Sequence, residues 1–289
     1  MKPRVALLGT GLMGAPMGER LLDGGYELTV WNRTAEKAEP LVARGARLAA
    51  SPRQALAAAD VALLMLRDGP VIQSLLLDGE GLPDLAGRTV VQMSTIAPAE
   101  SHELAAAVEA AGGGYLEAPV LGSTPQARQG TMIVFAGGDP AVFARALEVL
   151  LHLGPEPVRL GGVGSASAVK LALNQIIASH ITTLSLALGL VRASGVAPEA
   201  FLGILRKSAL HAPAFDGKLP RILGGDFGNP NFPTEMLLKD VDLALAEARH
   251  LGLDATALEG IRQVVEKAVA AGFGRDDYAA VSAVIAPSQ

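Results

Sequence analysis

Near its N-terminus the sequence reads Arg4-Val5-Ala6-Leu7-Leu8-Gly9-Thr10-Gly11-Leu12-Met13-Gly14. Residues 5–8 have the length and apolar composition of a buried parallel strand, and a glycine-rich turn and a helical pattern follow them. This G-x-G-x-x-G spacing between strand and helix indicates a dinucleotide-binding βαβ unit. Its glycines permit a tight turn, approach of a pyrophosphate to the backbone, and close packing of the helix on the strand. The expected cofactor contacts are Gly9, Gly11, Leu12, Met13 and Gly14.

The residues after the second strand indicate which dinucleotide is bound. Residues 27–31 are typical of a strand, and Asn32, Arg33 and Thr34 follow it as further expected cofactor contacts. An NAD site usually carries Asp or Glu here, about 20 residues after the glycines, to bind the ribose 2′-hydroxyl. Asn32 is neutral instead, and the Arg33 guanidinium can bind a 2′-phosphate through two hydrogen bonds. We therefore predict NADP as the preferred cofactor, with NAD as the alternative if Arg33 is an ordinary solvated loop residue.

Composition narrows the range of functions. The 289 residues are 50% hydrophobic and 18% charged, which allows substantial apolar cores, and the net charge of -5 argues against nucleic-acid binding. The chain has no cysteine, which excludes disulfides, thiol nucleophiles and thiolate metal sites. Its five histidines show no metal-ligand spacing, so no metal site is expected.

The sequence opens directly on a strand, without a targeting segment, so we expect a soluble cytoplasmic protein. One segment, 171–191, is apolar and about as long as a membrane span. It contains Asn, Gln, Ser, Thr and His residues, and Lys170 and Arg192 flank it. This polar content favours a helix buried among protein helices over a helix that crosses a membrane.

Strands and helices alternate up to about Leu160, and helices follow. The expected strands are 5–8, 27–31, 47–49, 60–66, 89–93, 114–118, 131–136 and 157–160. The expected helices are 36–43, 98–111, 165–193, 198–207, 233–250, 255–271 and 277–285. This order predicts an α/β protein with a Rossmann-like, doubly wound, mostly parallel sheet over residues 1–163. An all-helical domain over residues 164–289 should follow, entered by a long interdomain helix after a glycine-rich hinge.

Lys170 and Asn174 are candidate functional residues at the start of the helical domain. They are four residues apart and therefore share one helix face, in an otherwise apolar stretch. A cleft between a cofactor domain and a helical domain is a usual place for a ligand. There Lys170 would be a partly desolvated general acid/base beside an amide that orients the substrate. A lysine whose ammonium reaches solvent from the end of a helix is the alternative.

Five motifs occur in order along essentially the whole chain. They are LLGTGLMGAPM (7–17), QMSTI (92–96), EAPVLGS with a later GT (117–123 and 130–131), GGVGSASAVKLALN (161–174) and LKDVDLA (238–244). In these motifs the chain resembles the β-hydroxyacid dehydrogenases. That family includes 3-hydroxyisobutyrate dehydrogenase, tartronate semialdehyde reductase and the glyoxylate/succinic semialdehyde reductases.

The resemblance implies roles for the residues that would meet the substrate. Lys170 would be the catalytic acid/base, and Asn174 would position the substrate. Thr95, together with its neighbour Ser94, would lie by the nicotinamide and the substrate carboxylate. Backbone donors at Gly122 and Ser123 would hold that carboxylate.

The resemblance also implies a second group of residues around the cofactor. The backbone of Met65 and Leu66 would lie against the dinucleotide, and Lys239 would reach it from the helical domain. Asp240 would help to fix the helix that carries Lys239, and Phe232 would form a wall of the site. Ordinary packing and capping are the alternative explanations for Phe232 and Asp240.

One position departs from the family pattern. After Pro-Val the family usually has Ser-Gly-Gly or Ser-Gly-Ser, whose serine helps to hold a carboxylate, whereas this chain has Leu121. The pocket thereby loses one polar contact, which affects the choice of substrate more than the chemistry. Imine reductases share the architecture but typically lack the lysine, so Lys170 argues against them.

The sequence therefore predicts an NADP-preferring oxidoreductase of the 3-hydroxyisobutyrate dehydrogenase type. It would transfer hydride between the nicotinamide and a short β-hydroxyacid or its semialdehyde, and its partner would be that small-molecule substrate. The resemblance and the apolar helical half suggest a homodimer or homotetramer. A reductase of another carbonyl or imine class, and a non-catalytic NADPH-binding protein, are the alternatives.

Overall fold

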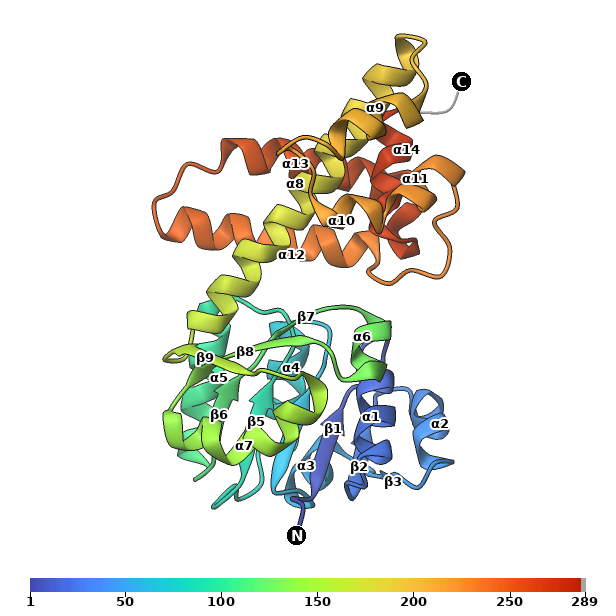
Figure 1. Cartoon of the computed structure of the whole chain (residues 1–289). Helices are drawn as coiled ribbons and strands as arrows, with labels where there is room; N and C mark the ends of the chain where they lie inside the picture. The colour runs from blue at the N-terminus through green and yellow to red at the C-terminus, as the bar shows by residue number, and fades with distance from the viewer. Residues whose placement is uncertain (287–289) are drawn as a thin grey trace. The chain divides into compact units, whose positions relative to one another are not determined.

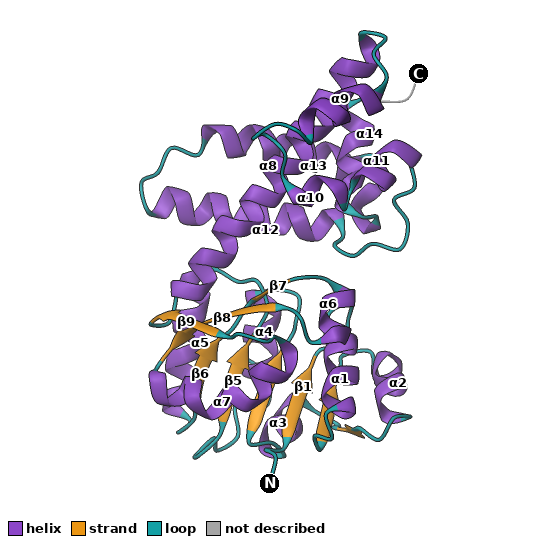
Figure 2. Cartoon of the chain, in the orientation of Figure 1, coloured by secondary structure: helices purple, strands orange, loops and turns teal. Residues whose placement is uncertain are grey.

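A computed structural model describes residues 1–286, and the chain forms two compact units (Figure 1). The first is Met1–Lys170, and the second begins at Leu171. Figure 2 shows a sheet with covering helices in the first unit and helices joined by loops in the second. The predicted fold class, a Rossmann-like α/β domain followed by a helical domain, is confirmed.

The sheet of the first unit is doubly wound around its first strand. Its strands are β1 (Val5–Leu8), β2 (Leu28–Trp31), β3 (Arg47–Leu48), β4 (Val61–Leu64), β5 (Thr89–Gln92), β6 (Gly114–Glu117), β7 (Val120–Leu121), β8 (Ile133–Gly138) and β9 (Val158–Gly161). Their order is β3-β2-β1-β4-β5-β6-β8-β7, and β9 pairs with β8. The pairs up to β6 are parallel, whereas β8 runs antiparallel to β6 and β7. The chain order reverses at β1, and in such sheets ligands bind at the carboxyl ends of the strands beside that point.

Helices cover both faces of this sheet, which explains why its central strands β1 and β4 are apolar and buried along their whole length. The helices are α1 (Gly14–Asp23), the 3-10 helix η1 (Ala35–Ala38), α2 (Glu39–Val42), α3 (Pro52–Ala57), α4 (Gly69–Leu76), α5 (Pro98–Ala110), α6 (Thr124–Gln129) and α7 (Pro140–Leu153). Alternate side chains of β1 enter two separate cores: Val5 and Leu7 pack in one, Ala6 and Leu8 in the other. The predicted helix 36–43 is instead η1 followed by α2, because Pro40 has no N–H to continue the first helix.

The second unit packs its helices around one apolar core. They are α8 (Ser165–Ala193), α9 (Pro198–Leu205), α10 (Pro213–Asp216), α11 (Leu219–Gly224), α12 (Thr234–His250), α13 (Thr256–Ala270), η2 (Phe273–Arg275), η3 (Tyr278–Ala280) and α14 (Val281–Ile285). The predicted single helix 277–285 is therefore split into η3 and α14. Its core draws on α8 through Ala178, Ile181, Leu184 and Leu188.

The long helix α8 has the bounds that the sequence predicts, but its first turns belong to the first unit. The predicted boundary lies between residues 163 and 164, whereas the compact units meet after Lys170. The reason is that the amides of Ala166 and Ser167 bond to the Glu117 carboxylate at the end of β6. By length and composition alone, α8 is also long and apolar enough to cross a membrane. A third of its most apolar window is buried within the protein.

Candidate functional site

The glycine-rich turn after β1 is shaped by two close backbone approaches. Gly9 has φ +100°, and a Cβ at this position would collide with the carbonyl oxygen of Met65. A Cβ on Gly14 would collide with the carbonyl oxygen of Gly9. These two glycines are thus required by the fold itself, because no larger residue fits where the turn meets the end of β4.

The middle of the same turn is open. A Cβ on Gly11 would meet no atom within 4 Å. The neighbouring Thr10 hydroxyl is buried and has no hydrogen-bond partner among the described residues. At the start of α1 there is thus open space at Gly11 beside the unpaired hydroxyl of Thr10. This arrangement fits the phosphates of a dinucleotide.

Asn32 and Arg33 have different surroundings at the end of β2. The Asn32 side chain accepts a hydrogen bond from the Thr10 N–H at 3.1 Å and donates one to the Thr34 carbonyl at 2.8 Å. It therefore ties the end of β2 to the glycine-rich turn. Arg33 is exposed, and its side chain makes no hydrogen bond or ion pair with the described residues 1–286. Its guanidinium is therefore available to a ligand.

A buried pair joins the ends of β4 and β5. The Ser94 hydroxyl accepts a hydrogen bond from the Leu66 N–H at 2.8 Å, and the fully buried Gln92 side chain donates to the Ser94 carbonyl at 2.9 Å. Ser94 thus holds the backbone at Met65 and Leu66 in place, whereas Thr95 is half-buried one residue further on. The motif includes Ser94, but the sequence does not show that its hydroxyl binds the backbone of Leu66. That hydrogen bond depends on the pairing of β4 with β5.

Lys170 meets the loop that the sequence predicts for the substrate. Its side chain is half-buried, and its Nζ donates a hydrogen bond to the Val120 carbonyl oxygen at 2.8 Å. Gly122, two residues later, has φ +147°. Both donors of Ser123 bond to the Gln126 side chain, the N–H at 3.0 Å and the hydroxyl at 2.8 Å. Ser123 therefore caps the start of α6, a role that its motif does not indicate.

In the helical unit, Asn174 and Asp240 form one buried arrangement. Asn174 is 2% exposed, and its Nδ2 donates to the Asp240 carboxylate on α12. The other Asp240 oxygen lies 2.9 Å from Lys239 Nζ. The Asn174 Oδ1 has no hydrogen-bond partner among the described residues. Asp240 thus turns the Asn174 amide so that its oxygen is left for a donor on a ligand, as a substrate-orienting amide requires.

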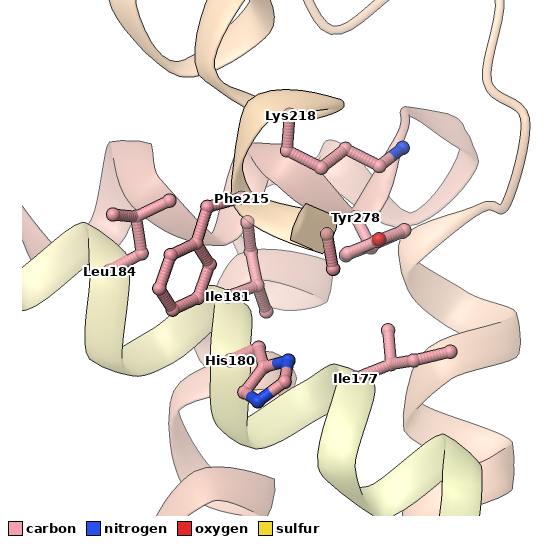
Figure 3. Close-up of a pocket in the computed structure, with 8 residues that line it drawn as sticks. Ile177, His180, Ile181, Leu184, Phe215, Lys218 and Tyr278 are labelled. Carbon is pink, nitrogen blue, oxygen red and sulfur yellow. The ribbon is translucent and has the colours of Figure 1, made fainter. Parts of the chain in front are cut away.

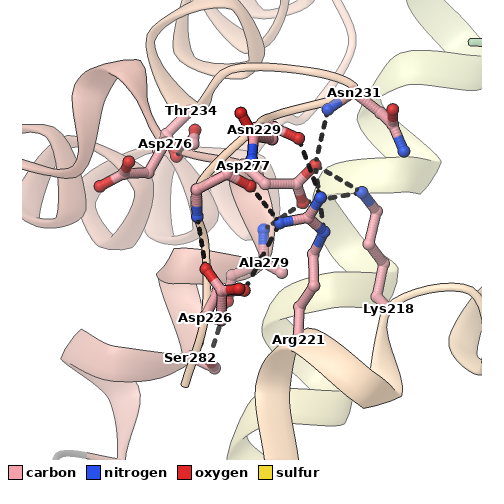
Figure 4. A network of polar contacts seen from close by, with 11 residues as sticks. Lys218, Arg221, Asp226, Asn229, Asn231, Thr234, Asp276, Asp277, Ala279 and Ser282 are labelled. Atoms are coloured by element: carbon pink, nitrogen blue, oxygen red, sulfur yellow. Dashed lines mark hydrogen bonds and ion pairs between the residues drawn. The ribbon is translucent and has the colours of Figure 1, made fainter. Parts of the chain in front are cut away.

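Phe232 lies on a loop that a buried aspartate organises. Its ring is half-buried and packs edge-on against Tyr278, with 5.7 Å between the ring centroids. Figure 4 shows Lys218 and Arg221 directed at Asp277, which is 0% exposed. Asp277 also accepts the N–H of Asn231 at 3.1 Å, next to Phe232. This network was not predicted, although it fixes the position of a predicted site residue.

The helical unit also contains a pocket further along α8 (Figure 3). It is a partly open hollow of about 270 Å³, solvent space at its mouth included, and it is lined by Ile177, His180, Ile181, Leu184, Ala214, Phe215, Lys218 and Tyr278. The His180 ring meets Phe215 edge-on, with 5.4 Å between the centroids. Ile177 and Ile181 continue the α8 face that carries Asn174, at helical spacing. The pocket walls are therefore mostly apolar, with one imidazole and one lysine.

The predicted site residues thus fall into two sets, one in each unit. The first unit carries the glycine-rich turn, Asn32 to Thr34, Met65, Leu66, Thr95, Gly122, Ser123 and Lys170. The second carries Asn174, Phe232, Lys239 and Asp240. Within residues 1–286, His, Asp and Glu side chains do not form a group of three or more that could hold a metal ion.

Comparison with known proteins divides the chain between residues 162 and 164, a few residues before the end of the first compact unit. Residues 4–162 match the NAD-binding domain of 6-phosphogluconate dehydrogenase, and residues 164–285 match the NAD-binding domain of NADP-dependent 3-hydroxyisobutyrate dehydrogenase. Glyoxylate/succinic semialdehyde reductase 1 of Arabidopsis thaliana is 33% identical over 279 residues, which cover 96% of each chain.

Two solved structures are examples of the same fold. Salmonella typhimurium 3-hydroxyisobutyrate dehydrogenase superimposes with a TM-score of 0.87 at 26% identity, covering 98% of this chain and 100% of that one. An imine reductase from Myxococcus stipitatus, in complex with NADP+, superimposes with a TM-score of 0.67 at 27% identity, with the same coverage. The whole chain thus has the fold of proteins that bind nicotinamide cofactors.

Proposed function

Because the chain belongs to the β-hydroxyacid dehydrogenase family, we propose that it transfers hydride between NADP and a short β-hydroxyacid or its semialdehyde. The observation that carries this proposal is the placement of Lys170. Its amine is held by the Val120 carbonyl in the substrate loop, one helical turn before the buried Asn174. A lysine that merely reached for solvent would not need this internal acceptor.

The residues of this chain would handle the proton and the orientation of the substrate. When bound, the nicotinamide supplies or accepts the hydride at the substrate carbon. Lys170 would give a proton from Nζ to the developing alkoxide oxygen during reduction and take it back during oxidation. The Asn174 oxygen, turned by Asp240, would accept a hydrogen bond from the substrate. Thr95 and the backbone at Gly122 would contact the substrate carboxylate.

The transfer itself can be followed with an isotope. NADPH carrying deuterium at C4 of the nicotinamide should deliver it to the carbon that bears the new hydroxyl, when the protein reduces glyoxylate or succinic semialdehyde. Mass spectrometry of the product measures this. Because only one of the two C4 hydrogens is transferred, the test uses NADPH deuterated on each face of C4 in turn, and unlabelled product from both would rule out direct hydride transfer.

Arg33 is the residue that we propose selects NADP. A guanidinium bound to a phosphate through charge-assisted hydrogen bonds contributes about 1.5–3 kcal/mol, so Arg33→Ala should weaken NADPH binding about 10–100-fold. Binding of NADH, which lacks the 2′-phosphate, should change by less than about twofold. Titration calorimetry measures both affinities. The control is Arg47→Ala, which removes an exposed arginine from the neighbouring strand β3; equal NADPH affinity in the two variants would refute the assignment.

Leu121 is the residue that we propose limits binding of carboxylates. Leu121→Ser would restore the hydroxyl that is usual in the family, and one more hydrogen bond to a charged group should raise kcat/KM for glyoxylate about 10-fold. Leu121→Ala is the matched control, since it removes the same apolar bulk without adding a hydroxyl. Steady-state rates with saturating NADPH measure the effect. A similar gain in both variants would show that space, and not the hydroxyl, was limiting.

A reductase of larger, less polar carbonyl compounds or imines is the second candidate. Two observations favour it: the apolar Leu121 in the substrate loop, and the mostly apolar pocket on the Asn174 face of α8. The fold similarity to an imine reductase is compatible with it. Lys170 favours the hydroxyacid chemistry over this alternative, because imine reductases of this architecture typically lack the lysine.

We also propose that the protein is a homodimer or homotetramer. Several large apolar side chains on α8 are exposed in the single chain, namely Val169, Ile176, Leu186 and Leu190. Their separations of 7, 10 and 4 residues place them on one side of the helix, which is typical of a surface that packs against another helix. Light scattering at micromolar concentration would test this, and a monodisperse monomer would contradict it.

A further inference from the structure

Glu117 is a buried carboxylate with an unusual set of partners. It ends β6 and is 0% exposed. Its Oε1 accepts the backbone N–H of Ala166 at 2.7 Å and that of Ser167 at 3.3 Å. Its Oε2 accepts the hydroxyls of Ser167 and Ser101, each at 2.6 Å. These two N–H groups lie in the first turn of α8. Glu117 therefore caps this helix, although it lies 49 residues before Ala166 in the sequence.

The protein makes room for this carboxylate. Gly137 on β8 pairs with Glu117 in the sheet, and a Cβ on Gly137 would collide with Glu117 Oε1. Ser101 is held in turn by the Tyr115 hydroxyl at 2.8 Å. Burial raises the pKa of Tyr115 above its ordinary value, which keeps this hydroxyl protonated. A charge taken fully out of water is costly, and the four donors together with the helix dipole offset that cost.

The segment 117–120, which begins with Glu117, also binds the amine of Lys170. Lys170 lies one turn beyond Ala166 on α8, and its Nζ donates to the carbonyl of Val120, which is three residues after Glu117. The start of α8 and the lysine are thus both fastened to residues 117–120. A shift of the helix start relative to this segment would move the amine away from the Val120 carbonyl.

We propose that Glu117 is a positioning residue for the reaction. Its carboxylate fixes the first turn of α8 to the substrate loop and so sets where the Lys170 amine lies, an inference that rests on the proposed function for its kinetic consequence. The negative charge is needed because an amide in the same place has only one acceptor oxygen for two N–H groups and two hydroxyls.

The kinetic test is Glu117→Gln, which keeps the size of the side chain and removes its charge. We expect kcat with a semialdehyde and NADPH to fall about 10–100-fold, while the KM for NADPH stays within about twofold. The matched control is Asp139→Asn: Asp139 caps α7 in the same unit, accepting the N–H groups of Ala141 and Val142, and has no contact with Lys170. If loss of a helix cap were a purely structural defect, both variants would lose thermal stability without loss of kcat.

A second readout does not depend on activity. Brief acetylation with acetic anhydride, followed by peptide mass spectrometry, measures how fast the Lys170 amine reacts. Glu117→Gln should raise this rate severalfold and Asp139→Asn should not. Faster labelling in a protein that reduces no semialdehyde would support the positioning role and reject the proposed function. Unchanged kcat and unchanged labelling in Glu117→Gln would overturn the positioning role.

Two further variants keep the proposal testable if Glu117→Gln does not fold. Glu117→Asp keeps the charge with a shorter reach, and it should recover part of the kcat that Glu117→Gln loses. Ser167→Ala removes one hydroxyl donor and leaves the carboxylate in place, so it should lower kcat only a fewfold. If Glu117→Gln fails to fold, a Ser167→Ala variant with unchanged kcat and unchanged Lys170 labelling would overturn the proposal.

Discussion

Replacing Lys170 with methionine should lower kcat about 10²–10⁴-fold, the usual contribution of a general acid/base. Methionine keeps most of the apolar length of the lysine side chain and lacks the amine that we propose exchanges a proton with the substrate oxygen. NADPH should bind with its wild-type affinity, because the glycine-rich turn and Arg33 are untouched. Steady-state kinetics and a fluorescence titration of NADPH measure the two quantities.

The control for this variant is Lys207→Met, which removes an exposed lysine after α9. It should leave kcat and NADPH affinity unchanged. A Lys170→Met protein with near-normal turnover would mean that another group, or water, moves the proton. The bond from Lys170 to the Val120 carbonyl would then have only a structural purpose.

Replacing Asp277 with asparagine should lower the free energy of unfolding by about 3–5 kcal/mol, because the charge of Lys218 would be left buried without its partner. Lys218 Nζ donates to both carboxylate oxygens of Asp277, at 2.7 and 2.8 Å, and it lies over the Tyr278 ring. Burial already lowers the pKa of Lys218, and hydrogen bonding to Asp277 offsets only part of this effect. Chemical denaturation followed by circular dichroism measures the loss.

A second change should recover much of that stability. In Asp277→Asn combined with Lys218→Met neither charge is buried, and such replacements of a whole pair are often close to neutral. The control is Glu259→Gln, which breaks the exposed ion pair between Arg249 and Glu259 and should have a much smaller effect. If Asp277→Asn is as mild as Glu259→Gln, the network of Figure 4 does not hold the Phe232 loop.

The sequence predicts most of the elements because their patterns are local. The bounds of α8, Ser165–Ala193, follow from a long apolar run between glycine-rich segments, and β1 follows from four apolar residues before the glycine turn. Local chemistry also explains the start of α3, where the Ser51 side chain accepts the Gln54 N–H ahead of Pro52. The strand expected over 60–66 ends at Leu64, because Met65 and Leu66 leave the sheet to meet the glycine turn.

The candidate site is only partly predictable, for a physical reason. Motifs identify the residues that a ligand would touch, but the residues that hold them are distant in sequence. Asp277 pairs with Lys218 across 59 positions, and Glu117 caps a helix that starts after residue 164. Such pairs become visible only when the fold brings them together. Ser123 is the reverse situation: its motif predicts contact with a ligand, but both of its donors bond to Gln126 at the start of α6.

Initial rates on a small substrate panel test whether the protein transfers hydride to or from a short β-hydroxyacid or semialdehyde. The reductive half contains glyoxylate, succinic semialdehyde and tartronate semialdehyde with NADPH and NADH. The oxidative half contains 3-hydroxyisobutyrate, L-serine and 3-hydroxypropionate with NADP and NAD. We predict one clearly preferred member of this panel, used about 10-fold or more faster with the phosphorylated cofactor. Tight NADPH binding with no turnover of any member would contradict the proposed function.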